Sequence, residues 1–313
     1  MTAIKTEGLT KRYGNITALD NLDLEVPDNV VFGFLGPNGA GKTTTVKPLT
    51  GFSQPTSGRA WVAGEEVGKN SLALQARTGL LPDVPAFYSW MRGREFLHYV
   101  GELHGMPRSD IKTQTDELLK LVDLKNAIDR RIGGYSRGMR QRLGNAQALV
   151  NRPSVLFMDE PTSALDPIGR REVLELILNL RETAAIFMST HILSDVERVC
   201  DMVGIVNGGR LQTVATVGEL KRKYTRSVFE MEFMEDAGAF AQELRHIEWL
   251  AEPEMVVENG TPVLRVRALD IDRAHKELLR LIAESGLTLT RYELTSPSIE
   301  DIFVEIVRSG EES

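Results

Sequence analysis

The apolar residues of this chain follow two different patterns over its first two thirds. Residues 22–26 alternate leucine and valine with aspartate and glutamate, which is typical of a strand with one buried and one solvated face. Three later runs, at 31–36, 155–159 and 184–190, are short and almost wholly apolar. Such runs are typical of parallel strands that are buried on both faces. The pattern therefore predicts an α/β fold.

Helical periodicity occupies the segments between these runs. Residues 94–150 are mostly helical in pattern, and Asp110 is expected to cap one of these helices. Asp166 followed by Pro167 predicts a further helix start, because a capping carboxylate precedes a proline at the first helical position. The segment 205–214 predicts a hairpin that turns at Asn-Gly-Gly.

The last part of the chain, residues 227–313, predicts a second, α+β unit. Its strand and helix patterns alternate in the order βαββαβ, which is the split βαβ or ferredoxin-like arrangement, and one more helix follows Pro297. Before this unit, the basic stretch 221–226 is interpreted as a solvated linker, with a contact to anionic lipid as the weaker alternative. The predicted elements lie at 227–233, 237–247, 255–269 (a hairpin around Asn259-Gly260), 271–286, 287–294 and 298–309.

Composition narrows the class of protein. The net charge of −7 and the pI of about 5.5 argue against nucleic acid as a partner, because that would need a basic patch. The only cysteine, Cys200, has no metal-ligand spacing and fits a reduced, cytosolic setting as a small buried residue. We find neither a signal-peptide pattern nor a run of about 18 apolar residues that could span a membrane. If the chain serves a membrane process, we expect another polypeptide to supply the membrane part.

The first chemical motif, GPNGAGKT, fits the pattern G-x-x-x-x-G-K-[ST] in full. Its glycines let the backbone curl so that N–H groups point at a phosphate, and the following helix N-terminus adds a positive potential. The lysine brings charge to the β- and γ-phosphates, and the threonine offers a hydroxyl to Mg²⁺. Pro48 removes a backbone donor in the second turn of that helix and is expected to kink or shorten it. The residues predicted to hold a nucleotide are Gly36, Pro37, Asn38, Gly39, Ala40, Gly41, Lys42, Thr43 and Thr44.

A pair of carboxylates ends the second apolar run. Asp159 is predicted to hold Mg²⁺ together with Thr43, as the second-strand aspartate of phosphate-loop enzymes does. Glu160 lies just outside the strand and is a candidate general base that polarises an attacking water. The weaker alternative is that the two residues only cap the following turn.

With these motifs, the segment YSRGMRQR at 135–142 makes the resemblance specific. The chain resembles the nucleotide-binding subunit of an ABC transporter, in the branch that serves ABC-2-type exporters. Ser136 and Gly138 match the serine and second glycine of the family signature L-S-G-G-Q, whereas Tyr135, Arg137 and Met139 replace its leucine, first glycine and glutamine. In the family this segment faces the γ-phosphate bound by the other subunit. The resemblance therefore implies a second copy, or a homologous subunit, paired head to tail around two ATP molecules.

The resemblance also implies roles for four further residues. Tyr13 stands where the family stacks an aromatic ring on adenine, and His191, in STH, matches the histidine that contacts the γ-phosphate. Asp166, in SALD, matches the loop that reaches the partner's phosphate site. Asp83 occupies the position of a metal-binding glutamine and is expected to bind Mg²⁺, through a water because its side chain is one methylene shorter.

By the same resemblance we expect a P-loop ABC ATPase domain over 1–218, with an antiparallel β subdomain and a helical insert at about 84–150. A linker at 219–226 and an accessory domain at 227–313 follow. The implied function is hydrolysis of ATP, with Mg²⁺ as cofactor, to power a separate integral membrane permease, an exporter by family likeness, from the cytoplasmic face of the cell membrane. Candidate permease contacts are Phe87, Tyr88, Trp90 and Met91, although a core aromatic cluster explains them equally well.

Three alternatives stay open at this point. A small-molecule P-loop kinase would share GPNGAGKT but has no use for the later motifs. An ABC-type ATPase acting on ribosomes or DNA generally has duplicated motifs or long coiled-coil inserts, which this sequence lacks. A soluble regulatory ATPase of the ABC type, acting on a non-transport partner with little turnover, is the nearest alternative.

Overall fold

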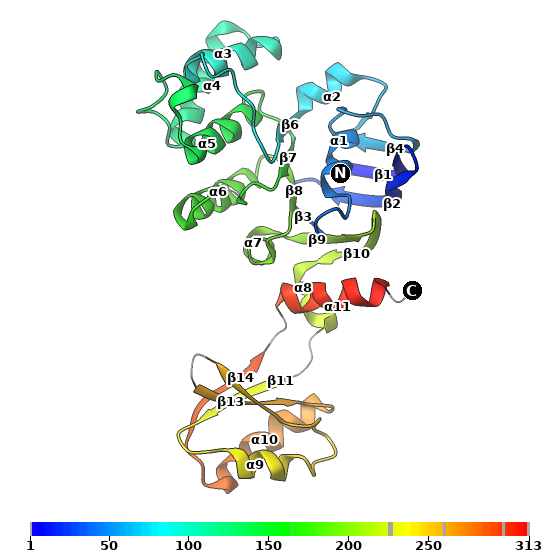
Figure 1. The fold of residues 1–313 in the computed structure, drawn as a ribbon, viewed down its shortest axis with the longest axis vertical. Coiled ribbons are helices and arrows are strands. Elements are labelled where there is room, and N and C mark those ends of the chain that lie inside the picture. The colour runs from blue at the N-terminus through cyan, green and yellow to red at the C-terminus, as the bar shows by residue number, and fades with distance from the viewer. Residues whose placement is uncertain (1, 164, 225–227, 259–260, 296–297, 312–313) are drawn as a thin grey trace. The chain divides into compact units, whose positions relative to one another are not determined.

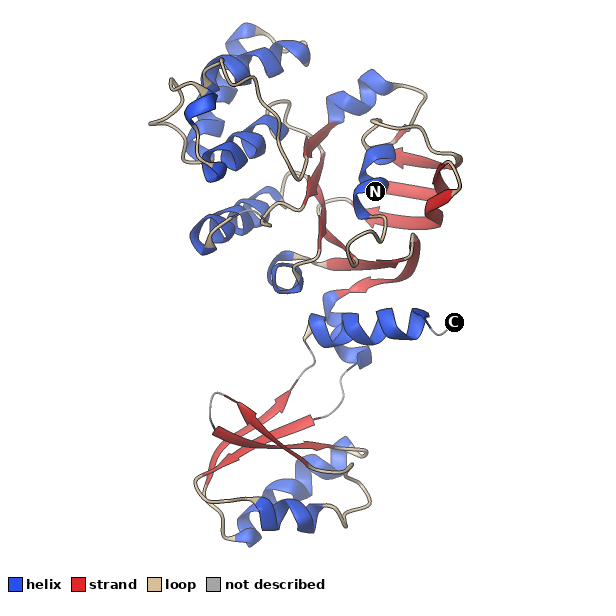
Figure 2. Ribbon diagram, in the orientation of Figure 1, coloured by secondary structure: helices blue, strands red, loops and turns tan. Residues whose placement is uncertain are grey.

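The computed structural model describes residues 2–163, 165–224, 228–258, 261–295 and 298–311. They divide into two compact units, one formed by 1–217 together with 303–313 and the other by 218–302. Figures 1 and 2 show the elements of each unit. No helix within the described ranges is long and apolar enough to cross a membrane.

The first unit begins with an antiparallel sheet in the order β2-β1-β4-β5. The apolar side chains of 22–26 are buried and the acidic ones are exposed, as their alternation predicts. One face of the sheet thereby joins the main core, which includes Leu22, Leu24 and Val26. The strands are β1 (Thr2–Tyr13), β2 (Ile16–Pro27), β4 (Ser57–Val62) and β5 (Glu65–Glu66).

A second sheet of the same unit has the order β10-β9-β3-β8-β7-β6. Its last five strands run parallel, and β10 forms the predicted antiparallel hairpin with β9. The rings of Phe34 and Phe157 each lie within 5.6 Å of Phe187, between centroids, so the three predicted runs meet in one aromatic core. The strands are β3 (Val31–Leu35), β6 (Thr78–Leu81), β7 (Val155–Asp159), β8 (Ala185–Thr190), β9 (Met202–Asn207) and β10 (Arg210–Thr216).

Helices of the first unit pack on the sheets and form the predicted insert. Helix α1 (Lys42–Leu49) contacts both sheets and ends one residue after Pro48, in line with the expected shortening. Helices α3, α4 and α5 lie together beyond β6 (Figure 1). The other bounds are α2 (Ser71–Arg77), α3 (Gly93–Leu103), α4 (Arg108–Leu121), a 3₁₀ turn (Ile132–Gly134), α5 (Arg137–Ala148), α6 (Pro167–Leu180) and α7 (Leu193–Val199).

One predicted cap is wrong. Helix α4 begins at Arg108 after Pro107, so Asp110 lies inside the first turn instead of capping it. The fixed φ of proline suits a helix start, and the carboxylate of Asp110 still interacts favourably with the positive end of the helix. The other predicted cap is confirmed, because Asp166 accepts a hydrogen bond from the backbone N–H of Gly169 at 2.8 Å.

The second unit has the predicted βαββαβ order. Its sheet is antiparallel in the order β12-β13-β11-β14, which is ferredoxin-like, and α9 and α10 lie together on one side of it (Figure 1). The turn at Asn259-Gly260 and Pro297 lie outside the described residues. The elements are β11 (Val228–Phe233), α9 (Gly238–Leu244), β12 (Glu254–Glu258), β13 (Thr261–Arg267), α10 (Ile271–Ser285) and β14 (Leu289–Thr295).

Two segments near the unit boundaries differ in detail from the sequence expectation. Residues 219–224, expected as part of a linker, belong to helix α8 (Val217–Tyr224), and Leu220 on this helix is buried. The last helix, α11 (Ile299–Glu311), is present as predicted. Its residues from Phe303 onward group with the first unit and not with the accessory unit.

Candidate functional site

Three parallel strands deliver the predicted chemical residues to one edge of the second sheet. Strand β3 leads into the glycine loop, β7 ends at Asp159, and β8 ends at Thr190. Leu35 pairs with Thr190, and Asp159 pairs with Ser189, so the three carboxyl ends lie in register. Ligand sites of open α/β sheets lie at this edge.

The loop between β3 and α1 is held close to its surroundings. A Cβ atom on Gly36 would come within 2.5 Å of the Val206 carbonyl oxygen. Gly41 has a φ of +107°, and a Cβ there would lie 2.6 Å from the carbonyl oxygen of Ala18. Only glycine fits both positions without a backbone shift. Because α1 begins at Lys42, the N–H groups of its first turn lack partners within the helix and are available to an anion.

Lys42 is the buried cation of the site, with 7% of its surface exposed. Its Nζ donates to the carbonyl oxygens of Gly36 at 2.7 Å and Pro37 at 3.3 Å, and lies 3.8 Å from Oε1 of Glu160. Burial lowers the pKa of Lys42 from its usual value, and the neighbouring carboxylates of Glu160 and Asp159 oppose that shift. Phosphate oxygens are natural additional partners for this ammonium group.

Asp159 joins the loop to the third strand. Its side chain is 4% exposed, and Oδ2 accepts a hydrogen bond from the hydroxyl of Thr43 at 2.8 Å. Its other oxygen accepts from the hydroxyl of Ser189. A carboxylate and a hydroxyl side by side are the hard oxygen donors that Mg²⁺ takes alongside phosphates. These residues therefore fit the predicted metal.

Glu160 lies beyond the strand end with a left-handed backbone, at a φ of +49°. Its Oε2 lies 2.9 Å from Nδ1 of His191 and accepts a bond from Thr190 at 3.4 Å. His191 is half-exposed, so the pair is open to solvent on one side. A carboxylate held between a histidine and a lysine at an open site can accept a proton from a bound water.

The remaining predicted residues make no direct hydrogen bond or ion pair with this group among the contacts of the described residues, although Ser163 bridges Asp83 and the Glu160 carbonyl oxygen. Ser136 caps α5 and accepts from the N–H of Met139 at 3.2 Å. A Cβ on Gly138 would have no heavy atom of the described chain within 4 Å, so this end of α5 faces open space. Tyr13 is half-exposed at the end of β1, and Asp83 accepts a long 3.4 Å bond from Ser163 and not from Thr43 or Lys42. Ala164 of the SALD motif lies outside the described residues.

The signature segment is anchored by a residue whose role the sequence did not indicate. Tyr135 is buried, and its hydroxyl donates to the Ala127 carbonyl oxygen at 2.8 Å. Burial raises the pKa of this phenol. The tyrosine that replaces leucine therefore adds a hydrogen bond between the signature segment and the loop before it.

Sequence reasoning also missed a buried network behind the site. Asp195 is almost fully buried and accepts from Thr162 at 2.5 Å and from Arg170 at 2.6 Å. It links the segment after Glu160, helix α6 and the helix after His191. The only sequence signal is an aspartate four residues after His191 within an amphipathic turn, which does not reveal partners 25 and 33 residues away.

A glycine loop before a helix, a second-strand aspartate and a parallel sheet together define a P-loop nucleoside triphosphatase. A family model described as "ABC transporter" matches residues 19–163, and one described as "ATP-binding protein DrrA1-3-like, C-terminal domain" matches 216–307. The uncharacterized ABC transporter ATP-binding protein YxlF of Bacillus subtilis (strain 168) is 39% identical over 98% of this chain and 100% of its own.

Two further similarities point to the same family. The bacitracin transport ATP-binding protein BcrA of Bacillus licheniformis is 35% identical over 99% of this chain and 98% of its own. A solved ATP-binding subunit of an ABC transporter superposes with a TM-score of 0.67 at 25% identity, covering 71% of this chain and 93% of that one. The chain belongs to the ATP-binding subunits of ABC transporters. It binds and hydrolyses ATP, and the fold and activity predicted from the sequence are confirmed.

Proposed function

We propose that this chain is the motor subunit that powers a separate membrane permease of the export type. The observation that carries the proposal is the assembled group of Lys42, Thr43, Asp159, Glu160 and His191 at one sheet edge. Full-length similarity to a bacitracin transport ATP-binding protein supports transport as the purpose of that site. The proposal places the chain at the inner face of the membrane, held there by the permease.

The residues present suggest a division of labour. Lys42 and the first-turn N–H groups of α1 bind the phosphates, while Thr43 and Asp159 hold Mg²⁺. When bound, the metal supplies neutralising charge for the β- and γ-phosphates. Glu160 orients the attacking water and accepts its proton. His191, held by its 2.9 Å contact with Glu160, contacts the γ-phosphate and helps to place the water, and Tyr13 stacks on adenine.

A site shared between two subunits would give Ser136 and Gly138 a role at the nucleotide. The open N-terminal end of α5, with Ser136 and Gly138, offers unpaired N–H groups and a hydroxyl to an anion. In a head-to-tail dimer this end would meet the γ-phosphate of the partner, and Asp166 would approach the same site from α6. Replacing Ser136 with arginine in one subunit of a mixed dimer should then stop hydrolysis at only one site; full turnover at both would argue against composite sites.

The aromatic residues expected to contact the permease divide into two groups. Phe87 packs edge-on against Phe96 at 5.1 Å between centroids, and Met91 is buried, so these two belong to the insert's core. Tyr88 and Trp90 are 50% and 66% exposed, with centroids 5.9 Å apart. We propose this exposed pair as the permease contact. Asp83 lies five residues before Tyr88, and its bond to Ser163 gives a route from the site to that surface.

The experiment compares Glu160→Gln with Glu182→Gln, which removes the same charge from an exposed position outside the site. We expect Glu160→Gln to bind ATP but to turn over roughly 10²–10⁴-fold more slowly, because glutamine cannot accept the proton. Glu182→Gln should match the wild type. Equal turnover of all three proteins would remove Glu160 from the proposed role.

Transport is tested separately: we expect a gene beside the one for this chain to encode a hydrophobic protein with about six membrane spans, and that protein is the candidate permease. Co-expression should recover a complex, and the permease should stimulate hydrolysis in a manner lost on Trp90→Ala. Hydrolysis that is intact but never responds to a membrane partner would favour the alternative, a regulatory ATPase acting on a non-transport partner.

A further inference from the structure

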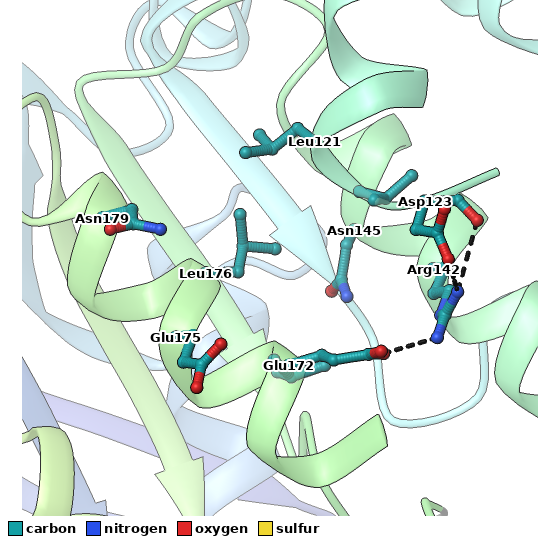
Figure 3. Close-up of a pocket in the computed structure, with 10 residues that line it drawn as sticks. Leu121, Asp123, Arg142, Asn145, Glu172, Glu175, Leu176 and Asn179 are labelled. Atoms are coloured by element: carbon teal, nitrogen blue, oxygen red, sulfur yellow. Dashed lines mark hydrogen bonds and ion pairs between the residues drawn. The ribbon is translucent and has the colours of Figure 1, made fainter. Parts of the chain in front are cut away.

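A second pocket lies away from the nucleotide residues, between the end of α4 and helices α5 and α6 (Figure 3). Its volume is about 190 Å³, and none of the nucleotide residues lines it. Figure 3 shows the side-chain amide of Asn145 lying between Leu176 and Arg142. The floor is apolar and the rim is charged. The floor consists of Leu121, Val122, Val173 and Leu176, and the rim of Asp123, Arg142, Glu172, Glu175 and Asn179.

Asn145 is a buried polar residue with an unsatisfied side-chain oxygen. The residue is 2% exposed, and its side-chain oxygen has no hydrogen-bond partner among the described residues. Other buried positions of α5 are apolar, as at Leu143, Ala146 and Ala148, or have a partner, as at Gln141, whose amide donates to the Pro161 carbonyl oxygen at 3.1 Å. A buried amide oxygen without a partner is costly, and in native proteins it commonly marks a site completed by another molecule.

The charge of the rim favours a cation. Arg142 is already paired with Asp123 at 3.1 Å and with Glu172 at 2.5 Å. The remaining carboxylate, Glu175, is held at 2.8 Å by Arg171, which lies outside the pocket lining. With both arginines counted, the three carboxylates leave one net negative charge at the rim. The C-terminal end of α4 at Leu121 adds the negative end of a helix dipole.

We propose that this pocket binds an alkylammonium group, with its N–H donors directed at the Asn145 oxygen and the rim carboxylates and its short apolar stem on the leucine and valine floor. The group needs donors because the unpaired atom is an acceptor, a positive charge because the rim carries one net negative charge, and carbon atoms because the floor is apolar. A free alkylamine and a lysine side chain of another polypeptide share this chemistry.

The test measures binding of n-butylammonium chloride to the full chain by calorimetry, at constant ionic strength. n-Butanol has the stem without the charge, and tetramethylammonium has the charge without N–H donors. Saturable binding of n-butylammonium, with neither control binding, is the expected result. No binding of n-butylammonium would leave water as the molecule that completes the pocket, and equal binding of all three compounds would show that neither the charge nor the N–H donors matter. Either result would overturn the proposal.

Two substitutions locate the site. Asn145→Leu should weaken n-butylammonium at least about tenfold, since a hydrogen bond to a charged group is lost. The same change should raise the unfolding temperature of the free protein by removing the unpaired polar atom, so a folding defect cannot imitate the result. Glu175→Gln should also weaken binding, whereas Glu182→Gln, beyond the end of α6, should not. An unchanged dissociation constant in Asn145→Leu would contradict the assignment.

The source of the ligand is read from a final comparison. If an acetylated, amidated tripeptide with a central lysine binds more tightly than n-butylammonium, the site takes a basic side chain of a polypeptide. If the free amine binds at least as tightly, it takes a small amine. Both outcomes are independent of the ATPase assays, so failure here leaves the proposed motor function untouched.

Discussion

Replacing Glu160 by alanine and, separately, by glycine should give two inactive proteins of different stability. Both substitutions remove the contacts of the carboxylate with His191 and Lys42, so those losses cancel in the comparison. The difference in stability between the two variants then depends on the backbone, which has a φ of +49° at this residue. Alanine must hold a left-handed conformation there, and glycine adopts it freely.

The size of the difference follows from two opposing terms. A left-handed conformation costs a residue with a Cβ atom about 1–2 kcal/mol. Glycine, however, gains more freedom in the unfolded chain, which costs about 0.5–1 kcal/mol against alanine. The glycine variant should therefore be more stable by about 1 kcal/mol or slightly less. For a unit of this size that corresponds to an unfolding temperature roughly 2–4 °C higher.

Thermal unfolding followed by calorimetry measures the difference, with ATP hydrolysis recorded on the same samples. Ala63→Gly is a matched control, because Ala63 has a φ of +51° and lies outside the site. It should gain a similar amount of stability and keep full turnover. If Ala63→Gly is stabilised but the two Glu160 variants unfold at the same temperature, the strained backbone at Glu160 is refuted.

Three further outcomes are expected. Thr43→Ala removes the hydroxyl that lies 2.8 Å from Asp159 and should raise the Mg²⁺ concentration needed for half-maximal hydrolysis; an unchanged requirement would exclude Thr43 as a ligand. Tyr135→Phe deletes the 2.8 Å hydrogen bond to Ala127 and should lower the free energy of unfolding by about 1 kcal/mol, as measured by denaturant titration. An unchanged free energy of unfolding would contradict a contribution of this buried hydrogen bond. Cys200 is partly buried, and its thiol packs against Gly33, where burial raises its pKa. A disulfide reagent at pH 8 should therefore modify the native protein much more slowly than the denatured one; equal labelling rates would contradict that packing.

The elements that the sequence predicts well are those whose pattern is local. The apolar runs that became β3, β7 and β8 are buried at every position, and their short length is typical of central strands. The glycine loop could be located because its φ values and close contacts admit few other residues. The accessory unit was predictable in order because turns and caps separate its strands and helices clearly.

The features that sequence patterns did not reveal depend on distant contacts. Nothing near Asn145 in the sequence shows that its amide would be buried without a partner, since the pocket is made by three helices that start at Arg108, Arg137 and Pro167. The same holds for Asp195, which reaches Thr162 and Arg170. The sequence also did not show which side chains are buried and which are exposed among Phe87, Tyr88, Trp90 and Met91, because aromatic content alone does not show which rings face inward.

The grouping of residues 303–313 with the first unit changes how the accessory unit is connected. The polypeptide enters that unit after Val217 and returns after Ile302, within helix α11, so the unit is an insertion with two covalent attachments and not a tail. Cutting the chain after residue 217 would therefore remove part of the first unit as well. Excising 218–302 and bridging the ends with a short flexible segment is the cleaner way to ask what the insertion contributes.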